Sequence, residues 1–213
     1  MKKAVKFIPK NMKLLVITSP HFFEGEARLI NALFERGLAC LHLRKPEAEM
    51  DTVAHLIGQI DTKFHSRLTI HHHHALSGSY AIGGIHFTEQ GRRASSAIEL
   101  QNYVSKGYRI STSVHQKESL STISPAFNYS FFGPVFDSIS KPGYSAAVDV
   151  ELPGTSPVPV YALGGVTAEN IIQLTQWGFS GAAVLGYIWQ NPHEVVQRFL
   201  ELSAKVRLMP TTS

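Results

Sequence analysis

Cysteine is almost absent from this sequence of 213 residues, in which Cys40 is the only one. An internal disulfide is therefore excluded, which suits the reducing cytoplasm, where we expect the protein to reside. Cys40 lies within the apolar run LACLHL. We interpret it as a buried strand residue and not as a nucleophile.

Long apolar runs are also lacking. None approaches the roughly 18–20 residues of a membrane span, so we expect no membrane segment. The first residues are basic and then apolar, but Lys13 interrupts the apolar part, which makes them a poor signal peptide. We expect residues 1–11 to form a loose extension and residues 12–213 to form one domain.

Charge is modest: charged residues make up 17% of the chain, and the net charge is +4. The basic residues are scattered and are not interleaved with exposed aromatic residues, so nucleic-acid binding has little support. A mild positive balance suits a small phosphorylated substrate. Nothing in the sequence sets the oligomeric state.

The chain alternates strand-like and helix-like segments, and 44% of its residues are hydrophobic. Short apolar runs bounded by Gly, Pro, Ser or charged residues are typical of parallel strands buried on both faces. Eight such units predict a single (β/α)8 TIM barrel in preference to a doubly wound sheet. The predicted strands are 13–18, 38–43, 67–71, 82–87, 108–113, 128–133, 158–163 and 181–185. The predicted helices are 24–36, 47–64, 94–105, 116–122, 168–177 and 192–206, with weak helices at 73–80 and 143–151.

Glycine turns follow the last two predicted strands. Gly164 and Gly165 end the first, and Leu185 and Gly186 end the second. Glycine lets backbone N–H groups approach an anion closely, and a helix N-terminus adds a positive dipole end. This pair of turns near the C-terminus predicts the phosphate pocket of a barrel.

Other candidate groups also follow strands, where barrel chemistry is located. Arg44 and Lys141 are candidates for anion contacts, with Ser138 and Ser140 as hydroxyl donors in the Lys141 loop. His115 follows three small hydroxyl residues, and an imidazole can both take and give a proton near neutral pH. It is the candidate general acid and base, or else a polar cap of the next helix.

Four consecutive histidines, 71–74, suggest either a tag or a metal site. A tag is not expected in mid-chain. Consecutive residues of a strand point to alternate faces, so at most two of the four can converge on one ion. The chain contains neither a Walker A motif nor a full dinucleotide fingerprint.

Six segments occur in order along roughly residues 13–205: HLRK (42–45), GGIHFTEQ (83–90), STSVH (111–115), FNYSFFGPVFDSISK (127–141), YALGGVTAENI (161–171) and GFSGAAVLGYI (178–188). In these segments the chain resembles the thiamine phosphate synthase family and its close relative, thiazole tautomerase. The resemblance makes one set of residues candidates for a pyrophosphate side: Arg44, Ser113, Ser138, Ser140 and Lys141. It makes a second set candidates for a thiazole phosphate side: Gly164, Gly165, Leu185 and Gly186.

The chain departs from the family where a synthase holds Mg²⁺ with two aspartates. An Asn-Asp pair of the family aligns with His71 and His72, and its second aspartate aligns with Gly91. Glu89 is the nearest remaining carboxylate, so Glu89, His71 and His72 are weak metal candidates. Pro46 replaces the second basic residue of the QLRxK segment, and Lys45 is a possible substitute.

The favoured reaction is therefore metal-free thiazole tautomerisation, with His115 as the acid and base and no cofactor. One alternative is thiamine phosphate synthesis from a pyrimidine pyrophosphate and thiazole phosphate, with Mg²⁺. Another is a non-catalytic barrel that binds a thiamine precursor.

Overall fold

The computed structural model describes residues 12–137, 151–152 and 156–207. The expectation for residues 1–11 and the candidates Ser138, Ser140 and Lys141 lie outside the described residues. So does almost all of the weak helix expected at 143–151.

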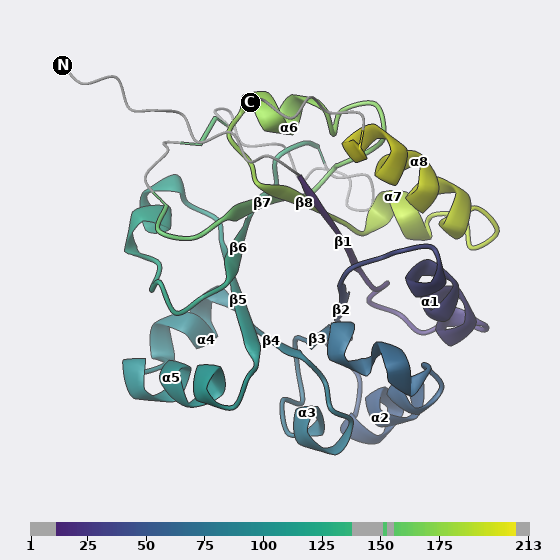
Figure 1. Ribbon diagram of the computed structural model, residues 1–213, viewed down its shortest axis with the longest axis horizontal. Helices are drawn as coiled ribbons and strands as arrows, with labels where there is room; N and C mark the ends of the chain where they lie inside the picture. The colour runs from purple at the N-terminus through teal and green to yellow at the C-terminus, as the bar shows by residue number, and fades with distance from the viewer. Residues whose placement is uncertain (1–11, 138–150, 153–155, 208–213) are drawn as a thin grey trace.

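Eight parallel strands close into a barrel in chain order, and helices surround it (Figure 1). The strands are β1 (Lys13–Ile17), β2 (Leu41–Leu43), β3 (Leu68–Ile70), β4 (Gly84–Phe87), β5 (Arg109–Val114), β6 (Tyr129–Phe132), β7 (Val160–Leu163) and β8 (Gly181–Val184). Pairing of β1 with β8 completes the ring. The predicted TIM barrel is confirmed, and every strand except β5, which runs one residue further, lies within its predicted range.

Helices are less regular than the sequence predicts. They are α1 (Glu26–Glu35), α2 (Met50–Gly58), α3 (Leu76–Ser79), α4 (Glu89–Ala94), α5 (Ala97–Ser105), α6 (Gln173–Gln176), α7 (Gly186–Trp189) and α8 (Val195–Arg207), with 3-10 helices η1 (Thr62–Arg67) and η2 (Lys117–Thr122). The single helix predicted at 47–64 is wrong, because α2 ends at Gly58 and η1 follows. Ile60 and Phe64, both buried, bring this second segment onto the core.

Two other helix predictions need correction. The helix predicted at 168–177 is reduced to α6, because its first part forms turns. The sequence analysis missed α4, which begins where the Thr88 side chain accepts a hydrogen bond from the N–H of Gly91. Such a side-chain cap satisfies a donor at a helix start, so a short helix forms with little apolar periodicity.

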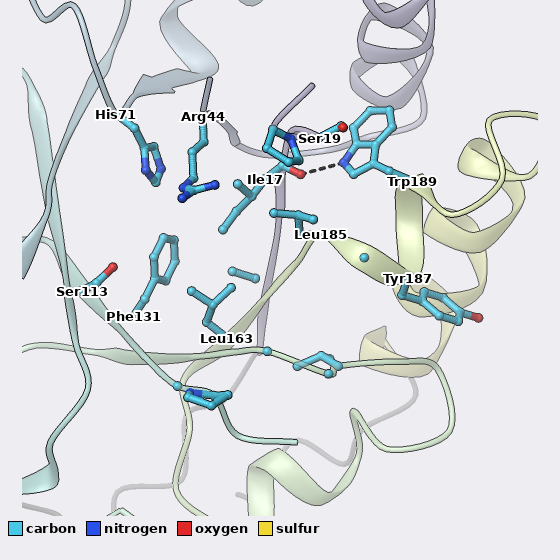
Figure 2. A pocket seen from close by; sticks show the side chains of 18 of the residues that line it. Ile17, Ser19, Arg44, His71, Ser113, Phe131, Leu163, Leu185, Tyr187 and Trp189 are labelled. Carbon is cyan, nitrogen blue, oxygen red and sulfur yellow. Dashed lines mark hydrogen bonds between the residues drawn. The ribbon is translucent and has the colours of Figure 1, made fainter. Parts of the chain in front are cut away.

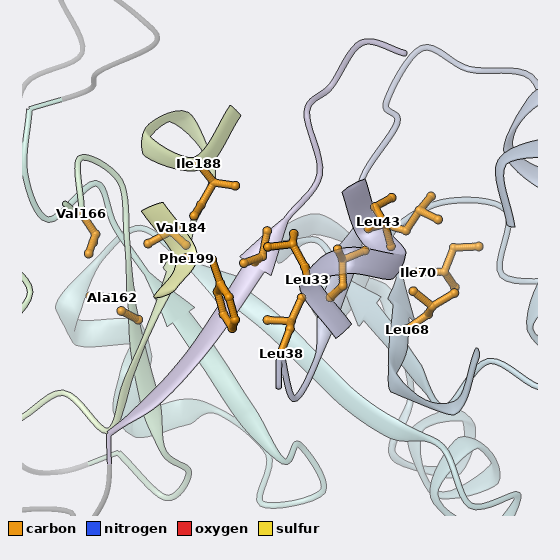
Figure 3. Packing of buried hydrophobic residues seen from close by; sticks show 14 of the residues in the cluster. Leu33, Leu38, Leu43, Leu68, Ile70, Ala162, Val166, Val184, Ile188 and Phe199 are labelled. Atoms are coloured by element: carbon orange, nitrogen blue, oxygen red, sulfur yellow. The ribbon is translucent and has the colours of Figure 1, made fainter. Parts of the chain in front are cut away.

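Alternation along the strands divides the apolar side chains into two cores. Val16 faces the helices, whereas its neighbours Leu15 and Ile17 face the barrel interior. The outer core packs strand residues such as Leu43 and Ile70 against the surrounding helices (Figure 3). The inner core is small, which leaves interior positions of β2 to β5 to polar side chains. Those positions form much of the site described below.

Cys40 is buried, as expected, but it lies just before β2 and not within it. Among the described residues, none of the helices has the length and apolar character needed to cross a membrane.

Candidate active site

A cavity of about 670 Å³ opens at the carboxyl ends of the strands (Figure 2). Most of the residues selected from the sequence meet there. Its lining includes Arg44, His71, Glu89, Ser113, His115, Gly164, Gly165, Leu185 and Gly186. His72 is not part of this lining. The structure therefore unites the two expected substrate sides, as far as their residues are described, in one pocket.

His115 follows directly on the last residue of β5 and lines this cavity. Its Nδ1 lies 3.1 Å from the carbonyl oxygen of Gly133. Because a carbonyl oxygen can only accept, the Nδ1–H must donate, and the neutral ring keeps its lone pair on Nε2. This arrangement selects the tautomer that can take a proton at Nε2.

Arg44 supplies positive charge to the cavity from the end of β2. Its backbone N–H donates to the Thr18 hydroxyl at 2.9 Å, and that hydroxyl lies 3.2 Å from the Arg44 carbonyl oxygen, to which it donates. These two contacts fix the backbone from which the guanidinium extends into the cavity (Figure 2). A planar guanidinium in this place can bind a carboxylate or phosphate through two hydrogen bonds.

Lys45 is not part of the cavity lining. Its Nζ lies 2.7 Å from Glu26 Oε1 and 2.9 Å from the carbonyl oxygen of His21, and its side chain is fully buried. Burial raises the pKa of Glu26 and lowers the pKa of Lys45, and each partner opposes the shift of the other. The idea that Lys45 substitutes for the family's second basic residue is therefore wrong, since its ammonium group is already enclosed.

The glycine turn after β7 has left-handed backbone, with φ of 97° at Gly164 and 65° at Gly165. A Cβ at Gly165 would lie 2.4 Å from the carbonyl oxygen of Asp137. Glycine is thus required for close packing on the segment after β6, besides its expected role in admitting an anion. The Asn170 amide donates to the Gly165 carbonyl at 2.9 Å and fixes the turn.

The second turn begins α7 at Gly186. Trp189, at the other end of this short helix, donates from its indole Nε1 to the Ile17 carbonyl at 2.7 Å (Figure 2). This bond ties α7 to the end of β1. The two glycine turns therefore face the same cavity on a backbone held by specific hydrogen bonds.

A layer of three buried histidines forms the floor of the cavity on the side of β2 to β4. The His42 Nδ1 lies 2.9 Å from the His71 Nε2, and the His42 Nε2 lies 2.6 Å from the Tyr129 hydroxyl. The His86 ring nitrogens contact the hydroxyls of Ser111 at 2.9 Å and Ser113 at 3.0 Å. We call His42, His71 and His86 the histidine layer.

Burial has the largest effect on the pKa values of the histidine layer. It lowers the pKa of His42 and of His71 well below the ordinary value, and the repulsion that a second protonated ring at His86 would exert lowers both further. It lowers the pKa of His86 to about 3, with smaller contributions from His74, Arg44 and His72. All three imidazoles are therefore neutral at pH 7.

Sequence reasoning missed His42 and His86 as members of the site. The available signal was alternation: each stands between two apolar residues, Leu41 and Leu43 or Ile85 and Phe87, which face the outer core. A residue between two outward-facing neighbours must point into the barrel.

The donor set of the cavity does not suit Mg²⁺. Glu89 is the only carboxylate that lines it among the described residues, and its Oε1 lies 2.6 Å from an Arg93 nitrogen and 3.8 Å from an Arg92 nitrogen. Mg²⁺ prefers several oxygen ligands, and imidazole replaces them poorly.

A closed (β/α)8 barrel with Arg44, two glycine turns and His115 at the carboxyl ends of its strands has the organisation of a barrel that binds a phosphorylated ligand. A comparison with known families matches residues 14–188 to the family described as thiamine monophosphate synthase. The chain therefore belongs to this family, whose members act in thiamine biosynthesis.

Relatives agree with this assignment. The chain is 27% identical over 192 residues to a putative thiamine-phosphate synthase of Geobacter sulfurreducens, covering 85% of this chain and 89% of the relative. It also resembles the crystal structure of thiamine phosphate pyrophosphorylase from Bacteroides thetaiotaomicron, with a TM-score of 0.71, 28% identity, and coverage of 93% and 100%. A Pyrococcus furiosus pyrophosphorylase shares the fold, with a TM-score of 0.74 and 18% identity over 93% of this chain and 97% of that one.

Proposed function

We propose that this protein is a thiamine-biosynthesis enzyme that binds a thiazole phosphate carboxylate and moves a proton within it, so that the ring becomes aromatic. The observation that carries this proposal is His115: the Gly133 carbonyl holds its Nδ1–H, and its imidazole lines the cavity. A fixed neutral imidazole can remove a proton at one ring position and return it at another.

The other residues have distinct roles in this proposal. The turns at Gly164–Gly165 and Leu185–Gly186 receive the phosphate through backbone N–H groups. The Arg44 guanidinium balances the carboxylate, together with charge that develops on the ring as the proton leaves. The apolar side chains of Ile17, Leu163 and Leu185 line the same cavity and reduce the access of water. No step requires a metal ion.

Thiamine phosphate synthesis is the second candidate, and the comparisons support it better than the first, because the relatives' names describe synthases or pyrophosphorylases. In such a reaction, Mg²⁺ bound through the substrate's own phosphates would help the pyrophosphate to leave. The protein would have to assist with few described groups, since Glu89 is paired with arginines and Lys45 is enclosed. Because the described residues offer few groups to assist the departure of pyrophosphate, we place tautomerisation first.

One experiment separates the candidates. Purified protein is supplied with the non-aromatic thiazole phosphate carboxylate, and aromatisation is followed by absorbance. In parallel it receives pyrimidine pyrophosphate and thiazole phosphate, with Mg²⁺ or with a chelator. We expect turnover in the first assay that a chelator does not abolish.

Efficient Mg²⁺-dependent coupling without aromatisation would overturn the proposal and establish the synthase. Binding of thiazole phosphate without turnover in either assay would instead indicate a non-catalytic barrel.

A further inference from the structure

The histidine layer has no assigned role in the reaction proposed above, although two of its members reach the cavity. His42 lies within β2, His86 lies within β4, and His71 directly follows β3. These are three consecutive strands of the barrel. Since inward positions alternate along each strand, the barrel geometry directs all three rings toward one region.

The ring geometry resembles a ligand set more than a packed apolar layer. One nitrogen from each histidine lies within 4.8 Å of the corresponding nitrogens of the other two. The His71 and His86 rings are stacked with centroids 4.0 Å apart, and His42 stands edge-on to both. Zinc–nitrogen bonds of about 2.0–2.1 Å in a tetrahedron place ligand nitrogens about 3.3 Å apart. To share one ion, the stacked His71 and His86 rings would have to turn out of their stacked arrangement so that their nitrogens converge at this spacing.

We propose that His42, His71 and His86 form a three-histidine site for a divalent transition metal, Zn²⁺ above all, with a fourth position open to the cavity. Neutral imidazole is a good ligand for Zn²⁺ and a poor one for Mg²⁺. This site uses imidazole nitrogens, whereas a Mg²⁺ site would require carboxylate oxygens.

Partners for two of the three remaining ring nitrogens, those of His42 and His86, are already in place. Metal-bound histidines usually donate their other N–H to an oxygen, which fixes the ring and its tautomer. The Tyr129 hydroxyl is positioned to hold His42 in this way, and the Ser111 hydroxyl is positioned to hold His86. Metal binding would replace the hydrogen bond between His42 and His71 and the one between His86 Nε2 and the Ser113 hydroxyl. A proton displaced from a ring nitrogen by the metal would move to the other nitrogen of the same ring.

The charge around the cavity indicates what takes the open position. His71, His86 and Arg44 line the same cavity. A dication and a guanidinium repel each other unless an anion lies between them. We therefore expect the fourth ligand to be a carboxylate or a phosphate oxygen, bound by the metal and Arg44 together.

The test uses full-length protein freed of metal with a chelator and then titrated with Co²⁺, whose absorption reports tetrahedral coordination. We expect one equivalent to bind and Zn²⁺ to displace it. His86→Asn and His71→Asn should weaken binding by at least about 100-fold. Tyr129→Phe, which keeps all three ligands, should weaken it by about 10-fold.

His72→Gln and His193→Gln are the matched controls, since His72 belongs to the histidine run and His193 is an exposed histidine elsewhere. Both should bind like wild type. Loss of binding in His72→Gln but not in His86→Asn would place the metal on the histidine run at 71–74 and overturn the proposal. Absence of any tetrahedral Co²⁺ spectrum would reduce the layer to a hydrogen-bonded core and would also overturn it.

Wild-type protein gives a check that needs no substitution. Anomalous scattering from crystals soaked in Zn²⁺ should place the ion between the three rings. A zinc position elsewhere contradicts the inference. Because these measurements contain no substrate, their outcome is independent of the outcome of the aromatisation assay.

Discussion

The imidazole of His115 is held by the backbone at Gly133, with 3.1 Å between Nδ1 and the carbonyl oxygen. The two residues follow the ends of neighbouring strands, β5 and β6. The contact therefore depends on strand register and not on a flexible loop. It fixes both the orientation of the ring and the position of its proton, which are the two requirements of an acid–base group.

Replacement of His115 by Asn should lower the rate of aromatisation by roughly 10²–10⁴-fold, because the amide cannot exchange a proton. Substrate affinity should change little, so the loss should be seen in kcat and not in KM. The measurement is steady-state absorbance with the thiazole phosphate carboxylate. His193→Asn is the control, and equal rates in wild type and His115→Asn would remove His115 from the mechanism.

Arg44 should act mainly on binding. Arg44→Gln removes a charged donor from the cavity, and hydrogen bonds to charged groups contribute about 1.5–3 kcal/mol, so KM should rise by about 10–100-fold. Arg36→Gln, at an exposed position, should leave KM unchanged. If Arg44→Gln kept the wild-type KM at low ionic strength, the guanidinium would have no part in holding the substrate.

The pair formed by Glu26 and Lys45 should be structural. Glu26→Gln leaves a buried ammonium without its counter-ion and should lower the free energy of unfolding by about 3–5 kcal/mol. Adding Lys45→Met should restore most of this stability, because the buried charge is then gone. Urea unfolding measures both effects.

The same double variant also tests whether Lys45 substitutes for the second basic residue of the family's QLRxK segment. KM and kcat of Glu26→Gln/Lys45→Met should stay near wild type. A rise in KM of about 10-fold or more, as expected for a lost charged contact, would show that Lys45 reaches the substrate after all.

Gly165 and Gly107 form a matched pair for the glycine turn. Both have positive φ, but a Cβ at Gly107 would meet nothing within 4 Å, whereas one at Gly165 would meet the Asp137 carbonyl at 2.4 Å. Gly107→Ala should cost about 1–2 kcal/mol of stability from backbone strain alone. Gly165→Ala should cost about 1–3 kcal/mol more from the clash.

Gly165→Ala should also weaken binding of thiazole phosphate, and Gly165→Val should do so further. Calorimetric titration with thiazole phosphate measures this, with Gly107→Ala as the control. Wild-type affinity in Gly165→Val would contradict the pocket assignment.

Local sequence was sufficient to predict the barrel. Apolar runs such as those of β1 and β8 are short, dense and bounded by polar or glycine residues, so strand positions can be recognised one at a time. Helices of four to six residues, such as α4 and α6, are set by capping and tertiary contacts. They leave little periodic signal.

The residues of the candidate site also divide into those that local sequence can identify and those that depend on tertiary contacts. Arg44 and His115 could be selected because residues at the carboxyl ends of barrel strands face the site, whereas Ser113 was selected from the family resemblance.

His71 was a weak metal candidate, and alternation within each strand indicates that His42 and His86 point inward. That the three rings meet depends on registry among β2, β3 and β4, which no single segment encodes. Lys45 was misassigned because its partner, Glu26, lies 19 positions away and its contact is purely tertiary.

The histidine layer should make folding sensitive to mild acid. The pKa of His86 falls from its ordinary value of 6.5 to about 3, and the pKa values of His42 and His71 are also well below 6.5. Between pH 6.5 and about 3 the unfolded chain binds protons on these rings while the folded chain does not. The free energy of unfolding should therefore fall as the pH falls, by up to about 1.4 kcal/mol per pH unit for each histidine.

Urea unfolding in the presence of a chelator, repeated across this range, measures the slope. His86→Asn should reduce the slope by up to about 1.4 kcal/mol per pH unit, the contribution of one histidine, whereas His193→Asn should leave it unchanged. If wild type and His86→Asn had the same slope, His86 would be protonated in the folded protein, and the buried neutral layer would be wrong.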